Sequence, residues 1–420
     1  MGINFPSSPL VGDLFPTPPL PGVPQYRWDG TIWATAPYTA TDYVKRSGDS
    51  MTGALSLPGN AASALQAVPK QQLETYAAPL DALSYSGMQV NGSMEVSQEN
   101  GPNAKLTSGH SVDSWFFFYD GTMTAQSGQS PTTVFPGFSS YLYVLINTPQ
   151  LTLGPGHQVG LMHLIEGYRI SRLGWGTANA KPLTIGFWTH HSRAGLYCVG
   201  VRNIGSTRSY VATYTATANI AQYHTITIPG CTDGTWAKDN TLGLTIVFTM
   251  AAGSTYTAPA ANVWTNGNFY AAPGQVNAAD GTHSFGITGL VVLPGIYAPT
   301  AAQSPLIMRP YDAELLTCMR YYQKFPPPGV TTVGVPTGAL YTTTSGVVFY
   351  NFPIPMRAAP TLTGLTTAFE VVGYGGMTAT PINPQTTPYS LRFDGASLSS
   401  ATYIGAPLVY LGPGNIDARL

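Results

Sequence analysis

Tryptophans in loops with several amide or carboxyl neighbours are the residues of this sequence that most clearly indicate a chemistry. An indole face can stack on the apolar side of a pyranose ring, while neighbouring Asn and Asp side chains bind its hydroxyls. Two turn-rich segments, 232–240 and 262–270, have this composition, and such segments are usually exposed. The candidate sugar-binding residues are Trp236 with Asp233 and Asp239, and Trp264 with Asn262, Asn266 and Asn268. Trp175 is a third candidate ring, and the alternative for each tryptophan is a place in the core of a β-sheet domain.

The acidic residues do not form a pattern typical of a catalyst. A glycosidase needs two carboxyl groups on either side of the scissile bond, and nothing pairs Asp233 or Asp239 with Glu166, which begins a strand-like stretch. His190 and His191 are adjacent, so on a strand they would point to opposite faces and could not share one metal ion. The sequence has no Gly-x-Ser-x-Gly motif and no short repeat typical of a β-helix. We therefore expect no enzymatic activity, no metal site and no cofactor.

The composition favours an all-β protein. Charged residues make up 9% of the 420 residues, against about 25% in ordinary globular proteins. The chain contains 46 Gly, 36 Pro and 25 Tyr, as expected for many turns and aromatic strand surfaces. A net charge of −1 with 18 Lys and Arg argues against nucleic-acid binding. Cys198, Cys231 and Cys318 are odd in number and widely spaced, so we expect them to be reduced and buried.

The sequence has no obvious targeting segment. No run of 18 apolar residues is present, so we expect no membrane-spanning helix. The first residues, MGINFPSSPLVGD, lack the charged and long apolar regions of a signal peptide. These observations predict a protein that is made in the cytoplasm and is not inserted into a membrane.

Residues 84–303 have the pattern of a two-sheet β-sandwich. Strand-like runs with turn signals between them recur over this region and just beyond it, with almost no helical period. The runs are Trp115–Tyr119, Tyr141–Ile146, Leu183–Trp188, Leu196–Arg202, Ser209–Thr215, His224–Ile228, Leu242–Phe248 and Phe285–Leu293. About eight strands over this length predict a β-sandwich of the jelly-roll type.

The segment before this domain divides into an anchor and a neck. Residues 1–42 are rich in proline and should be extended, apart from a hairpin at 26–33 in which Asp29-Gly30 marks a two-residue turn. We expect this segment to dock on a larger particle; the alternative is a flexible leader. Residues 43–83 should contain a short helix after Pro69 whose apolar stripe is too short to be stable alone. Three copies around an axis, or the chain's own next domain, could cover that stripe.

Residues 304–420 form a separate predicted β unit that opens with a short helix. Asp312 can cap this helix, and Leu315, Met319 and Tyr322 should lie on one of its faces. Short β runs follow at Gly338–Thr344, Val347–Phe352, Thr361–Thr363, Glu370–Tyr374, Tyr389–Phe393 and Leu408–Leu411. The loop 373–388, rich in Thr, Pro, Gln and Asn, is a candidate for contact with a receptor, whereas the alternative is a cap that only stabilises a trimer.

Several motifs resemble those of bacteriophage tail fibre and minor tail proteins. They are YVKRSGDSMTGALSLPGNAASALQAVPKQQLE at the neck, YRWDGTIW near the start, SYSGMQVNGSMEVSQENG and IEGYRISRLGWGTANAKPLTIGFW in the central domain, and CMRYYQKF with FPIPMRAAPTL near the end. In that family the central domain is similar in architecture to carbohydrate-binding modules. The resemblance implies a virion fibre subunit, and trimeric fibres are similar to this chain.

Together these patterns predict a homotrimeric virion fibre subunit that mediates host adsorption. Residues 1–42 would bind other virion proteins, and the jelly roll would bind a host-surface glycan through many weak contacts. Two alternatives stay open. One is a purely structural head, collar or baseplate decoration fibre, and the other is a depolymerase that cleaves surface polysaccharide.

Overall fold

The chain falls into two compact units, Met1–Pro69 and Lys70–Leu420. The structure is a computed structural model. It describes residues 3–20, 23–36, 87–132, 134–325, 333–335, 338–340, 345–363, 369–371, 380–396, 409–411 and 414–420. The predicted neck, residues 43–83 with its helix, lies outside this part of the chain. Among the described residues, no helix is both long and apolar enough to cross a membrane.

The first unit contains the predicted hairpin. Strands β2 (Tyr26–Trp28) and β3 (Trp33–Thr35) pair antiparallel, and β1 (Leu14–Phe15) adds to the free side of β2. Trp28 is paired with Trp33, so four residues connect the strands instead of the predicted two. The reason is a side chain: Asp29 Oδ1 accepts hydrogen bonds from the backbone N–H groups of Thr31 and Ile32, each at 2.8 Å, and so closes a wider turn.

An aromatic cluster stabilises this small sheet. The Phe5 ring stacks on Trp33 with centroids 5.1 Å apart and meets the edges of Phe15 and Tyr26 at 5.5 and 5.1 Å. Residues 3–20 and 23–36, the described part of the predicted anchor, thus form a small folded sheet and not only an extended proline-rich segment. The cluster explains this difference, because it gives a short sheet the apolar contacts that three strands alone would lack.

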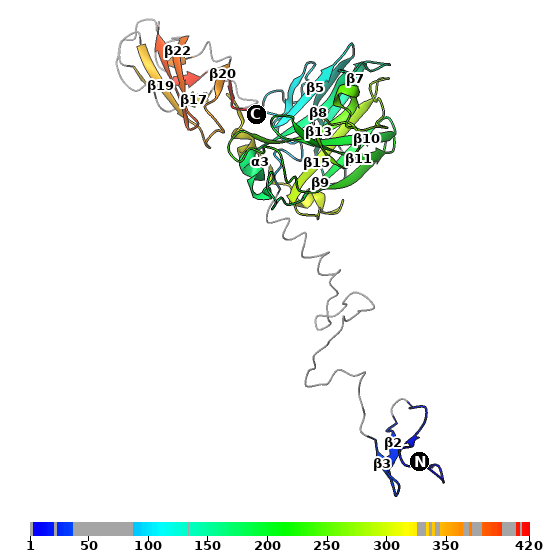
Figure 1. Cartoon of the computed structure of the whole chain (residues 1–420). Helices are drawn as coiled ribbons and strands as arrows, with labels where there is room; N and C mark the ends of the chain where they lie inside the picture. Colours follow the sequence, from blue (N-terminus) through cyan, green and yellow to red (C-terminus); the bar gives the residue numbers. More distant parts are fainter. Residues whose placement is uncertain are drawn as a thin grey trace. The chain divides into compact units, whose positions relative to one another are not determined.

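The second unit contains a β-sandwich of two antiparallel sheets, as the strand pattern predicts (Figure 1). One sheet has the order β14-β11-β10-β13-β8-β5-β4, with β4 Gly109–Val112, β5 Trp115–Asp120, β8 Gln158–Glu166, β10 Gly195–Arg202, β11 Arg208–Ala216, β13 Leu242–Ala252 and β14 Trp264–Asn266. The other has the order β12-β9-β15-β7-β6, with β6 Thr124–Pro131, β7 Ser140–Thr148, β9 Leu183–His191, β12 Ala221–Ile228 and β15 Ser284–Pro294. The jelly-roll-type sandwich and the mainly β fold class are confirmed.

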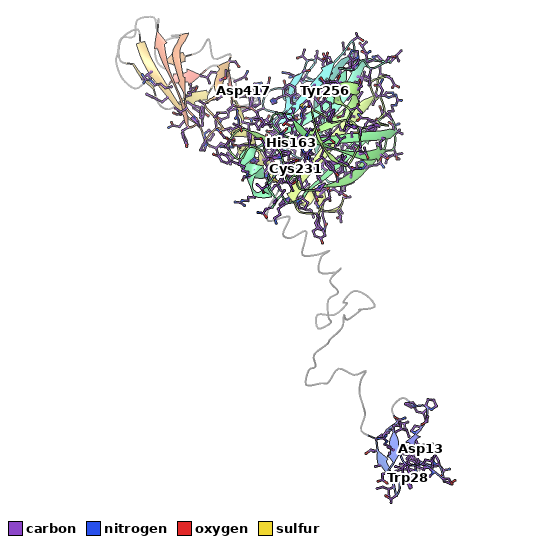
Figure 2. The ribbon with its side chains drawn as sticks, in the orientation of Figure 1. Asp13, Trp28, His163, Cys231, Tyr256 and Asp417 are labelled. Carbon is purple, nitrogen blue, oxygen red and sulfur yellow. The ribbon has the colours of Figure 1, made fainter. Side chains whose placement is uncertain are left out.

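Alternation along the strands builds the core between the sheets. Val199 and Val201 of β10 are fully buried in it, as are Ile185 and Phe187 of β9. All eight predicted runs are strands, and each extends by one to four residues beyond the predicted bounds. Four further strands, β4, β6, β8 and β14, were not predicted. In β8 the buried imidazole of His163 replaces an apolar residue, which hides the strand pattern (Figure 2).

Glu166 ends a strand and does not begin one, which corrects the prediction for the stretch after it. The helices α2 (Gly167–Ile170) and η1 (Ser171–Leu173) follow at once. Gly167 makes this turn possible, because a Cβ at its position would lie 2.7 Å from the Ala237 carbonyl oxygen. Two more short helices are η2 (Ser254–Tyr256) and η3 (Ser304–Ile307).

Residues 304–325 pack on the sandwich. Helix α3 runs from Tyr311 to Met319, and Pro310 rather than Asp312 is its N-cap residue, so the predicted side-chain cap is wrong. Asp312 instead lies in the first turn, where its negative charge interacts favourably with the helix dipole. The buried residues of α3 are Glu314 and Cys318, and Tyr322 already belongs to strand β16 (Tyr322–Phe325).

The remaining described strands form three small antiparallel sheets. Their orders are β16-β25-β20, β17-β24-β21 and β18-β19-β23-β22. Their bounds are β17 Val333–Val335, β18 Gly338–Leu340, β19 Ser345–Asn351, β20 Thr361–Thr363, β21 Phe369–Val371, β22 Thr380–Thr386, β23 Ser390–Ala396, β24 Val409–Leu411 and β25 Gly414–Asp417. Part of the predicted loop 373–388 is therefore the strand β22, because its Thr and Ile residues pair with β23. Residues 373–379 of that loop lie outside the described part.

Candidate ligand-binding sites

The three candidate tryptophans meet in one cluster. Trp175 lies 4.6 Å from Trp236 and 5.3 Å from Trp264 between ring centroids, in edge-to-face contact. Each indole N–H donates to a main-chain carbonyl, of Lys181, Asp233 and Pro229 respectively. Trp236 is only 6% exposed, so the premise that its ring is exposed is wrong. The turn-rich sequence of this loop predicted an exposed ring. The Trp236 ring instead packs on the other two tryptophans and extends the core.

The polar candidates around this cluster are held by protein partners. Arg208 bridges two of them, because its Nε lies 2.8 Å from Asp233 Oδ1 and its Nη1 lies 3.0 Å from Asn266 Oδ1. Asp239 is separate: it accepts hydrogen bonds from the hydroxyl and N–H of Thr241, which hold the pKa of its carboxyl below its usual value. Asn262 is exposed and has a left-handed backbone, with φ of 62°.

The structure thus brings together Trp236, Trp264, Asp233 and Asn266, but with the Trp236 ring buried. Sugar binding by these loops stays a prediction. A sugar could bind here only through the Asp and Asn side chains around the cluster or by contact with the partly exposed Trp264. Because stacking needs an open face, the geometry does not favour Trp236 as the central ring.

The groups considered for catalysis are used structurally. Glu166 is buried and accepts hydrogen bonds from Arg320 Nη2 at 2.6 Å and from the Tyr321 hydroxyl at 2.8 Å. His191 stacks between Tyr197 and Phe285 in the core, whereas His190 lines a pocket on the opposite face of the sheet, as predicted for adjacent strand residues. Within the described ranges, no group of three or more His, Cys, Asp or Glu could hold a metal ion.

The three cysteines are free and buried, which confirms the sequence prediction. Burial raises the pKa of the Cys198 thiol to about 12 and raises that of Cys318 as well. Thiols with such pKa values stay protonated at neutral pH and are poor nucleophiles. The cysteines are therefore packing residues.

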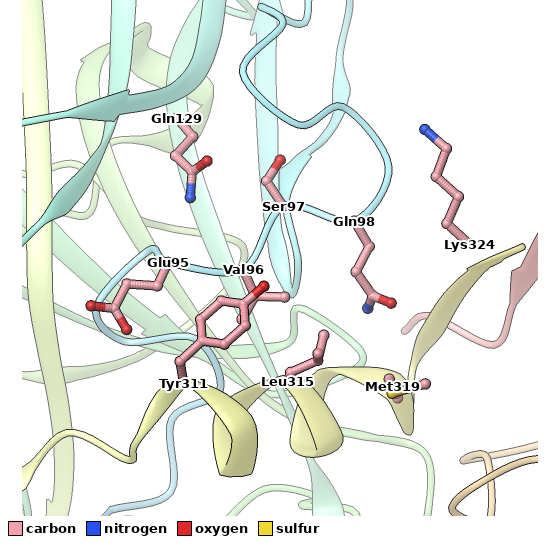
Figure 3. A pocket seen from close by; sticks show the side chains of 9 residues that line it. All are labelled: Glu95, Val96, Ser97, Gln98, Gln129, Tyr311, Leu315, Met319 and Lys324. Atoms are coloured by element: carbon pink, nitrogen blue, oxygen red, sulfur yellow. The ribbon is translucent and has the colours of Figure 1, made fainter. Parts of the chain in front are cut away.

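A pocket of about 340 Å³ lies between the sandwich and helix α3 (Figure 3). We call it the α3 pocket. Its lining combines apolar and polar side chains from four segments of the chain. They are Glu95, Val96, Ser97 and Gln98 of one loop, Gln129 of β6, Tyr311, Leu315 and Met319 of α3, and Lys324 of β16.

Helix α3 is fixed beside the loop by a buried carboxylate. Glu314 Oε1 accepts a hydrogen bond from the backbone N–H of Asn91 at 2.8 Å, and Arg309 pairs with the same carboxylate at 3.1 Å. Cys318 of the helix packs in a small core with Val90 and Val96. With this face of the helix buried, Tyr311 and Leu315 point toward the loop that carries Val96 and Gln98 (Figure 3). The Tyr311 side chain is 56% exposed.

The polar side chains of the α3 pocket are held in place. Gln98 donates from Nε2 to Asp113 Oδ2 at 2.5 Å and to the Tyr322 carbonyl at 2.8 Å. Gln129 donates to the Met94 carbonyl at 2.6 Å, and Lys324 donates to the Glu99 carbonyl at 2.9 Å. Burial raises the pKa of Asp113 to about 6, an effect that the two hydrogen bonds from Gln98 partly offset. The lining is therefore largely preorganised for a ligand.

A second pocket of about 200 Å³ lies on the outer face of the five-stranded sheet. Tyr141, Tyr143 and Leu145 of β7 line it together with His190 of β9. Gly286 makes room for the tyrosine, because a Cβ at this position would meet the Tyr141 ring at 3.0 Å. This pocket is smaller and more aromatic than the α3 pocket.

Neither pocket was predicted from the sequence. Leu315 and Met319 were predicted as one apolar face of the helix, and they do share the α3 pocket. Nothing in the sequence showed that residues 95–98 face that helix, since the two segments are more than 200 residues apart. The local signal in the sequence was Tyr311 at the start of a helix with Leu315 and Met319 on one face.

Comparisons with known proteins give a weak fold likeness. No family model and no curated protein matches the sequence. Among solved structures, the enzymatically active domain of tailspike protein 4 of bacteriophage CBA120 is 11% identical with a TM-score of 0.28, over 50% of this chain and 22% of that one. The family 11 carbohydrate-binding module of a Clostridium thermocellum cellulase is 13% identical with a TM-score of 0.24, over 46% of this chain and 95% of that one. The module TmCBM61, in complex with β-1,4-galactotriose, is 10% identical with a TM-score of 0.23, over 43% of this chain and 88% of that one.

Proposed function

We propose that this chain is a glycan-binding subunit of a bacteriophage fibre and that the α3 pocket holds the glycan. The observation that carries the proposal is the lining of this pocket. Val96, Leu315 and Met319 offer an apolar floor, and the exposed Tyr311 ring offers a stacking face. Sugars present an apolar C–H face and a rim of hydroxyls, so they fit a site of this mixed character.

Binding without cleavage is the better account of the pocket. Glu95 is the one carboxylate among the described side chains that line it, and it already accepts a hydrogen bond from the Ser139 hydroxyl at 2.9 Å. Hydrolysis of a glycosidic bond needs a second acid about 5 to 10 Å away. The depolymerase alternative therefore has no support in this pocket.

The fibre part of the proposal rests on the sequence motifs and on the first unit. That unit carries exposed apolar side chains, among them Leu10 and Val11, each 74% exposed, and Ile32, 62% exposed. Such a surface supports docking on other virion proteins. A homotrimer at the virion surface would then multiply weak glycan contacts into attachment. The alternative is a decoration fibre with no role in attachment.

The test is a Tyr311→Ala variant of the full chain. Host polysaccharide binding should weaken about fivefold per site, because a stacked aromatic ring contributes roughly 1 kcal/mol, and host adsorption should fall further through avidity. Tyr168→Ala is the matched control, since Tyr168 is 59% exposed but lies outside the pocket. Thermal melting checks that both variants fold.

Three results separate the alternatives. Unchanged binding and adsorption by a folded Tyr311→Ala variant would contradict the assignment of the α3 pocket. Fibres that lack any measurable glycan affinity, on particles that infect normally, would favour a decoration role. Release of new reducing ends from the polysaccharide by purified protein would favour the depolymerase.

A further inference from the structure

Arg202 is a half-buried cation on the outer face of the seven-stranded sheet. It is the last residue of β10, and since Val199 and Val201 face the core, Arg202 points away from it. Its Nη1 donates to Asn268 Oδ1, and its Nη2 lies 3.3 Å from the Met162 sulfur. The guanidinium carbon lies 5.4 Å from the centre of the Tyr270 ring. Every one of these partners is uncharged.

No carboxylate forms an ion pair with Arg202 among the described residues. Most of the other half-buried arginines have one: Arg193 pairs with Asp280, Arg208 with Asp233, Arg309 with Glu314, and Arg320 with Glu166. The Nε of Arg202 is buried without a hydrogen-bond partner. Burial lowers the pKa of its guanidinium. A cation that is buried without a counter-charge lowers the stability of the folded protein. Stability therefore does not explain why an arginine occupies position 202, and a role in binding could.

The surroundings of Arg202 form an aromatic surface with polar groups. Tyr256, labelled in Figure 2, stacks on Tyr270 with centroids 4.8 Å apart, and it is partly exposed. Phe116 and Met162 are paired on adjacent strands and are partly exposed beside it. Gly200 lets Tyr270 lie against β10, because a Cβ there would be 2.4 Å from the Tyr270 Cβ. The fold thus places a platform of rings directly beside the uncompensated guanidinium.

We propose that Arg202 binds the carboxylate of an acidic sugar, with Tyr256 and Phe116 as the flanking apolar surface. This surface is separate from the α3 pocket, and the proposal rests on the proposed function only where it names a sugar as the carrier of the carboxylate. A guanidinium matches a carboxylate in shape and charge. A hexuronic acid would supply the missing negative charge and a ring face at the same time.

A purely structural role for Arg202 makes a different prediction for stability. If its contacts to Asn268, Met162 and Tyr270 hold the fold, Arg202→Met should lower the melting temperature clearly and leave ligand binding intact. If Arg202 is kept for a ligand, removal of an uncompensated charge should leave the melting temperature unchanged or raise it.

The binding test uses the full chain with hexagalacturonate and its fully methyl-esterified form, which has no charge. Calorimetry at low salt should show that Arg202→Gln weakens binding of the acid at least about tenfold, as expected for a lost charge-assisted pair. Binding of the ester should not change. Arg193→Gln is the matched control, because Arg193 is a partly exposed arginine whose charge Asp280 already compensates.

Several outcomes would overturn the proposal. These are equal binding of the acid by wild type and Arg202→Gln, no binding of the acid by wild type, or binding at Arg202 of a Glu-rich peptide but of no acidic sugar. Tyr311→Ala distinguishes this failure from that of the proposed function. A variant that loses host polysaccharide at the α3 pocket would keep the proposed function in place even if Arg202 binds nothing.

Discussion

Trp175 shows how a residue with a plausible binding chemistry can serve packing instead. Its ring is 2% exposed and contacts both Trp236 and Trp264, and its N–H donates to the Lys181 carbonyl at 2.7 Å. Trp175→Ala should therefore cost about 3 to 5 kcal/mol in the free energy of unfolding, because it leaves a cavity between two rings. Urea unfolding would measure this.

The control for Trp175 is Trp264→Phe at the partly exposed edge of the same cluster. It keeps an aromatic ring and should cost less than half as much. A Trp175→Ala variant within about 1 kcal/mol of wild type would contradict the packing role.

At the residue scale, the local sequence predicted some properties of a side chain and not others. Burial of the three cysteines follows from their type, and the opposite faces of His190 and His191 follow from strand geometry. Exposure of Trp236 was wrong because it depends on how its loop packs. Among the residues that the structure describes, no carboxylate pairs with Arg202. This depends on neighbours in space, which a single sequence does not contain.

At the scale of elements, the link between α3 and the sandwich depends on a buried ion pair. Arg320 follows α3 and binds both carboxylate oxygens of Glu166, at 2.6 and 2.9 Å, where β8 ends. Arg320→Ala should lower the free energy of unfolding by about 3 kcal/mol or more, because Glu166 would be left buried without its counter-charge. The measurement is chemical unfolding of the variant.

A double variant separates charge from packing at this junction. Glu166→Gln combined with Arg320→Met removes both charges and should recover much of the loss, as expected for a buried pair. If Arg320→Ala and wild type unfold at the same denaturant concentration, the pair does not contribute to stability.

Elements with strict alternation were predicted well, while those that depend on distant partners were not. The runs at 183–188 and 242–248 are apolar and β-branched, and both are strands. Strand β8 contains His163 in its middle, and β14 has only three residues, so neither has a clear period. The α3 pocket needs α3 and the loop 95–98 to meet, which no local pattern predicts.

For the second unit as a whole, buried histidines set the response to acid. Burial lowers the pKa values of His110, His163 and His191 to about 3 and that of His224 to about 4. In the unfolded chain these imidazoles titrate near pH 6.5. Below that pH the unfolded state binds more protons at these imidazoles than the folded state does, so acid destabilises the fold.

Asp113 acts in the opposite direction. Burial raises the pKa of its carboxyl to about 6, from its ordinary value of 3.8. Between these two values the folded state binds more protons than the unfolded state at this site, so this one group loses stability as the pH rises. It can offset about one of the four histidines between pH 4 and pH 6. The four histidines and Asp113 together should therefore still lower the free energy of unfolding as the pH falls.

We therefore expect the melting temperature to fall steadily as the pH is lowered from 6.5 to 4. Each uncompensated histidine contributes up to about 1.4 kcal/mol per pH unit to this slope. His163→Gln should flatten the slope, because His163 is fully buried and its neutral ring donates from Nδ1 to the Ser114 carbonyl while Nε2 accepts from the Val90 N–H. The amide of Gln can also donate and accept, and it carries no charge in acid. The control is His157→Gln, since His157 lies in a loop and is partly exposed. A melting temperature that is constant or rises over this range would contradict the lowered pKa values of these imidazoles.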